Sequence, residues 1–140
     1  MADVTLYHFT SPDHLPLILR DGFLKTVESN VSFRREHAGP DVVWLTTHER
    51  AEAGHGLENP RHDKRAIRFT VRLDKRAVHR WREWARAKGS SAETMALLAE
   101  ASGGGVSSWR VTERAIPSSA WVEVRDMRTG EVLWPGDPRR

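Results

Sequence analysis

Cysteine is absent from the 140 residues of the chain, which excludes disulfide bonds, thiolate metal ligands and a cysteine nucleophile. Long hydrophobic runs are absent too, since no segment approaches the roughly 18 apolar residues that a membrane-spanning helix needs. The first residues lack the basic and apolar regions of a secretory signal peptide. From these absences we expect a cytoplasmic protein with no membrane partner.

Tyrosine is nearly absent: the chain has one, Tyr7, against six tryptophans and four phenylalanines. Few groups therefore titrate between neutral pH and the lysines, which is why a formal net charge of only +3 coexists with a pI near 9.8. The high pI overstates the charge. A net charge of +3 is compatible with a nucleic-acid partner but indicates one only weakly.

The hydrophobic pattern is that of an ordinary folded domain, with 39% hydrophobic and 29% charged residues. The predicted strands lie at residues 4–10, 42–46, 66–73, 108–112, 121–125 and 131–134. In the third, apolar residues at 67, 69, 71 and 73 alternate with Arg68, Thr70 and Arg72, which predicts one core face and one solvated face. The last two strands are predicted to form a hairpin around residues 128–130. The predicted helices lie at residues 12–21, 46–53, 74–88 and 90–101, with Asp74 as the cap of the third and Ser90 as the cap of the fourth. Strands outnumber helices without regular alternation, which favours the α+β class. We expect a single domain over residues 1–134 and a flexible tail over 135–140.

Seven histidines call for a test of metal binding. They include no His-x-x-x-His pair on a predicted helix, and no glutamate stands at zinc-protease spacing, so no metal site is predicted. The sequence also has no Walker loop, no Gly-x-Gly-x-x-Gly turn after a strand and no Gly-x-Ser-x-Gly elbow. The glycines at 103–105 follow a predicted helix and indicate a joint rather than a phosphate-binding loop.

His8 stands near the end of the first predicted strand, just ahead of a helix that Ser11 caps and Pro12 opens. An imidazole at this position can hydrogen-bond a ribose hydroxyl or a carbonyl, while the amides of a helix N-terminus face a polar ligand. A half-buried structural histidine explains the same local pattern, and the local residues alone favour that interpretation.

Three blocks of sequence follow one another at a characteristic spacing. The first has Leu-Tyr-His-Phe-Thr-Ser at 6–11, Leu-Pro-Leu-Ile-Leu at 15–19 and Asp-Gly-Phe at 21–23. The second is Val-Val-Trp-Leu-Thr-Thr at 42–47, and the third runs from Trp109 to an Ile-Pro turn. Together they resemble the ADP-ribosyltransferase superfamily, most closely the DarT-type DNA-modifying toxins and the RNA 2′-phosphotransferases.

The resemblance implies a small split sheet, mixed or antiparallel, with flanking helices and a cleft that binds NAD as a substrate. It implies an enzyme that cleaves the bond between nicotinamide and ribose and transfers ADP-ribose to a nucleic acid or a protein. Two alternatives stay open on the same fold. One is an RNA 2′-phosphotransferase, and the other is an inactive module that binds a nucleotide or a partner protein.

The resemblance also assigns roles to residues. It places His8 on a ribose of NAD, with Thr10 as its companion and Tyr7 as support. The other implied residues are Phe33 or Trp44 for stacking on nicotinamide, Thr46 for NAD, Arg34 or Arg35 for phosphate or the reaction centre, and Glu113, with Glu123 next, for catalysis.

The chemistry of the reaction explains why the implied active site needs a carboxylate. Breaking the nicotinamide–ribose bond passes through an oxocarbenium-like state, as glycoside cleavage does, and a carboxylate that faces the developing positive charge lowers the barrier. Glu113 fits this role, and it fits equally well a solvent-facing strand residue between Thr112 and Arg114.

The predicted helix at 74–88 carries six basic residues. If DNA or RNA binds, the Lys75–Lys88 segment is the predicted place. Trp81 and Trp84, three residues apart, have the spacing for stacking on bases, although core packing is the commoner reason for such a pair. We expect a monomer.

Overall fold

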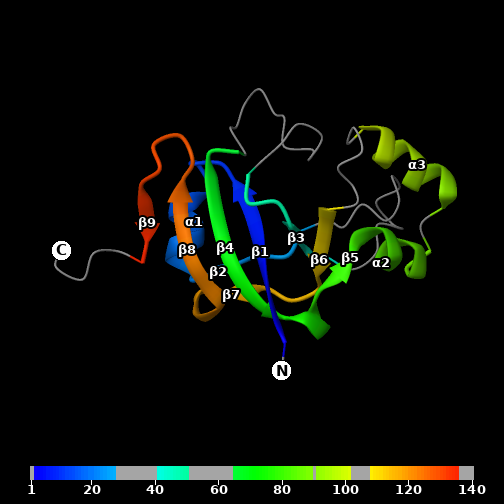
Figure 1. Cartoon of the computed structure of the whole chain (residues 1–140), viewed down its shortest axis with the longest axis horizontal. Helices are drawn as coiled ribbons and strands as arrows, with labels where there is room; N and C mark the ends of the chain where they lie inside the picture. The colour runs from blue at the N-terminus through cyan, green and yellow to red at the C-terminus, as the bar shows by residue number, and fades with distance from the viewer. Residues whose placement is uncertain (1, 28–40, 51–64, 90, 102–107, 136–140) are drawn as a thin grey trace.

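The computed structural model describes residues 2–27, 41–50, 65–89, 91–101 and 108–135, which are drawn in colour in Figure 1. They form a small mixed α/β domain in which an antiparallel sheet predominates and helices are few. Among these residues, no helix has the length and apolar character needed to cross a membrane.

The main sheet is built from seven strands of the described chain. Their bounds are β1 Asp3–Thr10, β3 Val43–Thr46, β4 Ile67–Asp74, β5 His79–Arg80, β6 Trp109–Thr112, β8 Trp121–Asp126 and β9 Val132–Trp134. The order across the sheet is β5-β6-β3-β1-β4-β8-β9, and the registered pairs are antiparallel. Two short strands, β2 (Phe23–Leu24) and β7 (Ile116–Pro117), pair with each other.

Helical segments are short. The α-helices are α1 Leu15–Asp21, α2 Trp81–Ala87 and α3 Ala92–Ala101, and single 3-10 turns lie at Lys75–Ala77 (η2) and Ser118–Ala120 (η4). Figure 1 shows α1 behind β4 and β8, while α2 and α3 lie at the β5 end of the sheet, far from β9.

One face of the sheet forms the main core because side chains alternate along each strand. On β4, Ile67, Phe69 and Val71 are buried in this core, and they alternate with Arg68 and Thr70 on the opposite face. Residues of α1, β2 and β7 pack over the buried face. Burying each large apolar side chain contributes roughly 1.5–3 kcal/mol, so this layer holds the sheet and its cover together.

The opposite face carries a second, smaller core at its β6 end. There α2 buries Trp81, Trp84 and Ala85 against Val111 of β6. The ring of Trp44 on β3 lies 6.0 Å from that of Trp81. The core-packing interpretation of the two α2 tryptophans is therefore confirmed, and neither ring is available for stacking on bases.

The prediction of one helix from Asp74 to Lys88 is wrong. The Asp74 carboxylate accepts a hydrogen bond from the backbone N–H of Arg76, but the turn it caps, η2, ends after three residues. Val78 is extended, and β5 pairs with β6 before α2 begins at Trp81. The edge of β6 offers backbone hydrogen bonds that compete with helix formation. Val78 is β-branched, which favours an extended backbone at this position.

The first helix starts later than predicted. Ser11 does not cap it, because its hydroxyl lies 3.0 Å from Nδ1 of His14, and α1 begins at Leu15 rather than at Pro12. Its predicted end is confirmed: Gly22 takes the left-handed φ of 77° that a residue with a Cβ adopts only with strain.

The helix predicted at 90–101 is largely confirmed as α3. Its cap lies one residue later than expected, since the Ser91 hydroxyl accepts from the backbone N–H of Thr94, and residue 90 lies outside the described chain. The helix predicted at 46–53 is not found in its described part: residue 46 is in β3, residues 47, 49 and 50 are bends, and 51–53 lie outside the described residues. The C-terminal hairpin is confirmed, with Gly130 in its turn at a φ of 80°.

Candidate functional site

Within the main sheet, the contact between β1 and β3 is short. Every residue of β1 is in register with β4, whereas β1 and β3 share a single registered pair among the described residues, Tyr7 with Thr46. We call Tyr7, His8, Trp44 and Thr46 the β1–β3 junction. All four are residues that the sequence resemblance assigns to NAD.

His8 adds a side-chain link at the junction. Its Nδ1 lies 2.8 Å from the backbone carbonyl oxygen of Trp44. Because a carbonyl can only accept, Nδ1 is assigned the proton, which leaves Nε2 as an acceptor when the ring is neutral. Burial lowers the pKa of His8 below its ordinary 6.5, against a smaller opposing effect of the Trp44 carbonyl, so the ring is neutral at pH 7.

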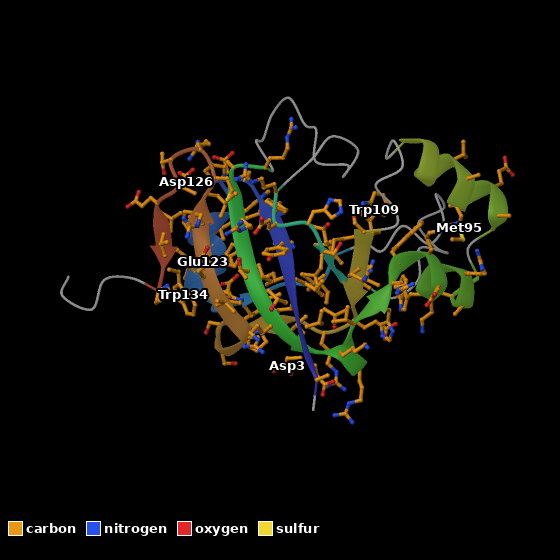
Figure 2. All side chains as sticks on the ribbon, viewed as in Figure 1. Asp3, Met95, Trp109, Glu123, Asp126 and Trp134 are labelled. Carbon is orange, nitrogen blue, oxygen red and sulfur yellow. The ribbon has the colours of Figure 1, made fainter. Side chains whose placement is uncertain are left out.

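A row of side chains crosses the sheet from the junction. Tyr7 on β1 is directly opposite Thr70 on β4, and Thr70 is directly opposite Glu123 on β8. In the other direction, Thr46 on β3 faces Trp109 on β6. Residues opposite one another in antiparallel strands project to the same face, so all five lie on the face away from the main core. In Figure 2, Trp109 and Glu123 mark the two ends of this row.

Arg68 ties the row together. Its guanidinium carbon lies 5.4 Å from the centre of the Tyr7 ring, and its Nη2 donates to Oε1 of Glu123 at 2.9 Å. Arg125 donates from Nε to the same oxygen at 2.9 Å and from Nη2 to Oε2 at 3.2 Å. These bonds, that of Arg125 foremost, lower the pKa of Glu123 despite its partial burial. The carboxylate is therefore ionised at neutral pH.

Two polar atoms beside this carboxylate lack partners among the described residues. They are Oγ1 of Thr70, which is only 8% exposed, and Nε of Arg68. Buried polar groups in folded proteins nearly always have a hydrogen-bond partner, and an unpaired one costs about 1–3 kcal/mol. A polar ligand seated on this face can supply the missing bonds.

Glu113, the first choice for the catalytic carboxylate, lies away from the row. Trp84 donates from Nε1 to its Oε1 at 3.0 Å, and the Lys88 ammonium lies 3.3 Å from the same oxygen. The Trp84 bond is the main reason that the pKa of Glu113 is lowered. Glu113 is four residues past Trp109, which is about 14 Å along a strand. The structure thus brings Glu123, not Glu113, into line with the junction.

The other residues predicted to bind NAD or to act in catalysis lie in separate parts of the chain. Thr10 is buried at the end of β1, on the same side of the strand as His8 and opposite to Tyr7. Trp44 packs edge-on against Trp109, with ring centres 5.6 Å apart, so its ring belongs to an aromatic cluster. Residues 33–35, which include the predicted stacking phenylalanine and the two arginines, lie outside the described chain.

Arg68 and Thr70 were missed by the sequence reasoning, which treated their side of β4 as a solvated face. The alternation of the two with Ile67 and Phe69 did place them on the right face. Their proximity to Tyr7 and Glu123 depends on strand pairing between distant segments, which periodicity does not contain. In the described ranges, no group of three or more His, Asp or Glu side chains gathers closely enough to hold a metal ion.

In comparisons with known proteins, no protein-family model, no curated protein and no solved structure matches the chain.

Proposed function

We propose that the protein is an NAD-dependent ADP-ribosyltransferase whose substrate binds at the β1–β3 junction and whose catalytic carboxylate is Glu123. The observation that carries this proposal is the alignment of Tyr7, Thr70 and Glu123 on one face, next to the junction. Within the continuous seven-stranded sheet, β1 and β3 share a single registered pair, and this short contact is where we place the substrate.

Each group in the row has a chemical role in this proposal. The ionised Glu123 holds the 2′-hydroxyl of the nicotinamide ribose and stabilises the positive charge that develops at C1′. Arg68, fixed by Glu123 and by the backbone carbonyl of Glu49 at 2.8 Å, offers its remaining N–H to a phosphate oxygen. The Thr70 hydroxyl bonds a polar atom of the substrate.

His8 supports the site at the junction without facing the row. It projects from the side of β1 opposite to Tyr7, and its ring packs edge-on against Phe69 of the main core. Its Nδ1 bond to the Trp44 carbonyl holds β3 beside β1. In the reaction, the bond from C1′ to the nicotinamide nitrogen breaks and nicotinamide leaves with the bonding electrons. An oxygen or nitrogen of the acceptor then bonds to C1′ and gives up its proton.

The experiment is to incubate the purified protein with labelled NAD and, separately, single-stranded DNA, RNA or cell lysate. Release of nicotinamide with transfer of label to one of the acceptors is expected. NAD binding, followed by calorimetry, should weaken in His8→Ala. Saturable binding with no turnover on any acceptor would leave a binding module, and no NAD binding at all would overturn the proposal.

A further inference from the structure

Basic side chains concentrate at the β5 end of the sheet, over residues 74–88 and 110–114. This region has three carboxylates, Asp74, Glu83 and Glu113. Its eight cationic residues are Lys75, Arg76, Arg80, Arg82, Arg86, Lys88, Arg110 and Arg114. The region therefore has a net charge of +5, whereas the whole chain has +3.

The cations of the two ends of the sheet are paired differently. At the β8 end, Glu123 binds Arg68 and Arg125, and Asp126 binds Arg128. At the β5 end, Arg76 pairs with Asp74 and Lys88 with Glu113.

Three arginines at the β5 end remain without such a partner. Arg80, Arg82 and Arg86 are exposed and form no ion pair with any described residue. Arg82 and Arg86 are one turn apart on α2, about 6 Å along its axis. Within the described residues, no ion pair neutralises these three charges.

Two arginines also face each other across the edge of the sheet. Arg80 on β5 is directly opposite Arg110 on β6, and like charges in this position destabilise an antiparallel pair. Arg110 is partly buried, which lowers its pKa; the nearby Arg80 lowers that pKa further, against a smaller opposing effect of Glu83. A bound anion would relieve this repulsion.

We infer that the surface formed by Arg80, Arg82, Arg86 and Arg110 binds the phosphodiester backbone of a nucleic acid. Arg80 and Arg110 project from the sheet face opposite to Val111, against which α2 packs, so the basic surface runs around the β5 edge of the sheet. A chain of closely spaced phosphates can follow this edge, which a single small anion cannot. Guanidinium groups suit this ligand because their planar N–H groups bond phosphate oxygens in pairs. The inference does not depend on the proposed chemistry, since binding is measured without NAD.

The test is fluorescence anisotropy with labelled single-stranded DNA, single-stranded RNA and duplex DNA over a range of salt concentrations. Four phosphate contacts predict a slope of log K against log salt of about −2.8 for a single strand, or roughly 50-fold weaker binding between 50 and 200 mM salt. In Arg82→Gln/Arg86→Gln the slope should fall to about −1.4. Whichever oligonucleotide binds most tightly identifies the backbone recognised.

A matched control is Arg20→Gln/Lys25→Gln, which removes the same charge from the exposed cations that pair with Asp21. It should leave the slope unchanged, and circular dichroism should show both double variants folded. The inference is overturned if the wild-type protein binds no oligonucleotide at low salt, or if the two double variants weaken binding equally. Binding to phosphatidylserine vesicles but to no oligonucleotide would overturn it as well.

Discussion

Arg68 and Glu123, which are 55 residues apart in the sequence, join β4 to β8 through a bond of 2.9 Å from Nη2 to Oε1. Their side chains are 12% and 23% exposed, so water screens this pair less than the ion pairs at the surface. The pair holds a charged carboxylate on the face that also carries Tyr7.

Arg68→Gln should lower the free energy of unfolding by about 2 kcal/mol, because it leaves the carboxylate partly buried with one partner fewer. Urea unfolding measures the loss. The control is Arg76→Gln, which breaks the exposed pair with Asp74 and should leave the midpoint within experimental error. Equal losses in the two variants would contradict the structural role given to Arg68.

Stability should depend on pH through Glu123. Its pKa is lowered in the folded state from the ordinary 4.5, chiefly by the bond from Arg125, so the unfolded chain takes up this proton first as pH falls. The contribution of Glu123 is therefore complete above the ordinary value and is lost as pH falls through the folded value. Urea titrations of the wild type and Glu123→Gln should converge toward acid pH, and a constant difference would contradict the assignment.

His8 should titrate below 6.5, because burial lowers its pKa. The stability that depends on the neutral ring is present above 6.5 and decreases as pH falls through the folded pKa. Nitrogen-15 NMR should show the proton on Nδ1 at neutral pH. A midpoint above 6.5, or a proton on Nε2, would argue against the bond to Trp44.

Thr70→Val should separate stability from binding. Replacing an unpaired, buried hydroxyl by a methyl group should leave the free protein as stable or raise its unfolding free energy by up to about 1 kcal/mol. The same change should weaken NAD binding by about tenfold, which is the loss of one hydrogen bond. Thermal unfolding and calorimetry measure the two effects. Clear destabilisation with unchanged affinity would show that the hydroxyl has a structural role.

Much of the fold follows from local sequence. The alternation over Ile67–Asp74 and the glycine at 130 were enough to predict β4 and the last hairpin. Asp74 shows the limit: it caps a helical turn as its sequence context predicts, yet the edge of β6 converts the next residues to strand. Helix periodicity could not anticipate that competition, because the competing hydrogen bonds come from residues 110–111.

The site could be predicted only in part for the same reason. Tyr7, His8, Trp44 and Thr46 come from two short blocks that a resemblance can identify, and the structure brings them together. The choice between Glu113 and Glu123 required the register of β1, β4 and β8. Position in the chain favoured the first of these carboxylates, whereas strand pairing favours the second.

Nicotinamide release by Glu123→Gln and Glu113→Gln, measured side by side with the wild type, tests the central claim most directly. We predict that Glu123→Gln lowers the rate about a hundredfold, as expected for the loss of one electrostatic contact in the transition state. Glu113→Gln should keep the wild-type rate, because Glu113 lies beyond the end of β6, beside Trp84 and Lys88 and away from the junction. A normal rate in Glu123→Gln together with loss of activity in Glu113→Gln would contradict the assignment.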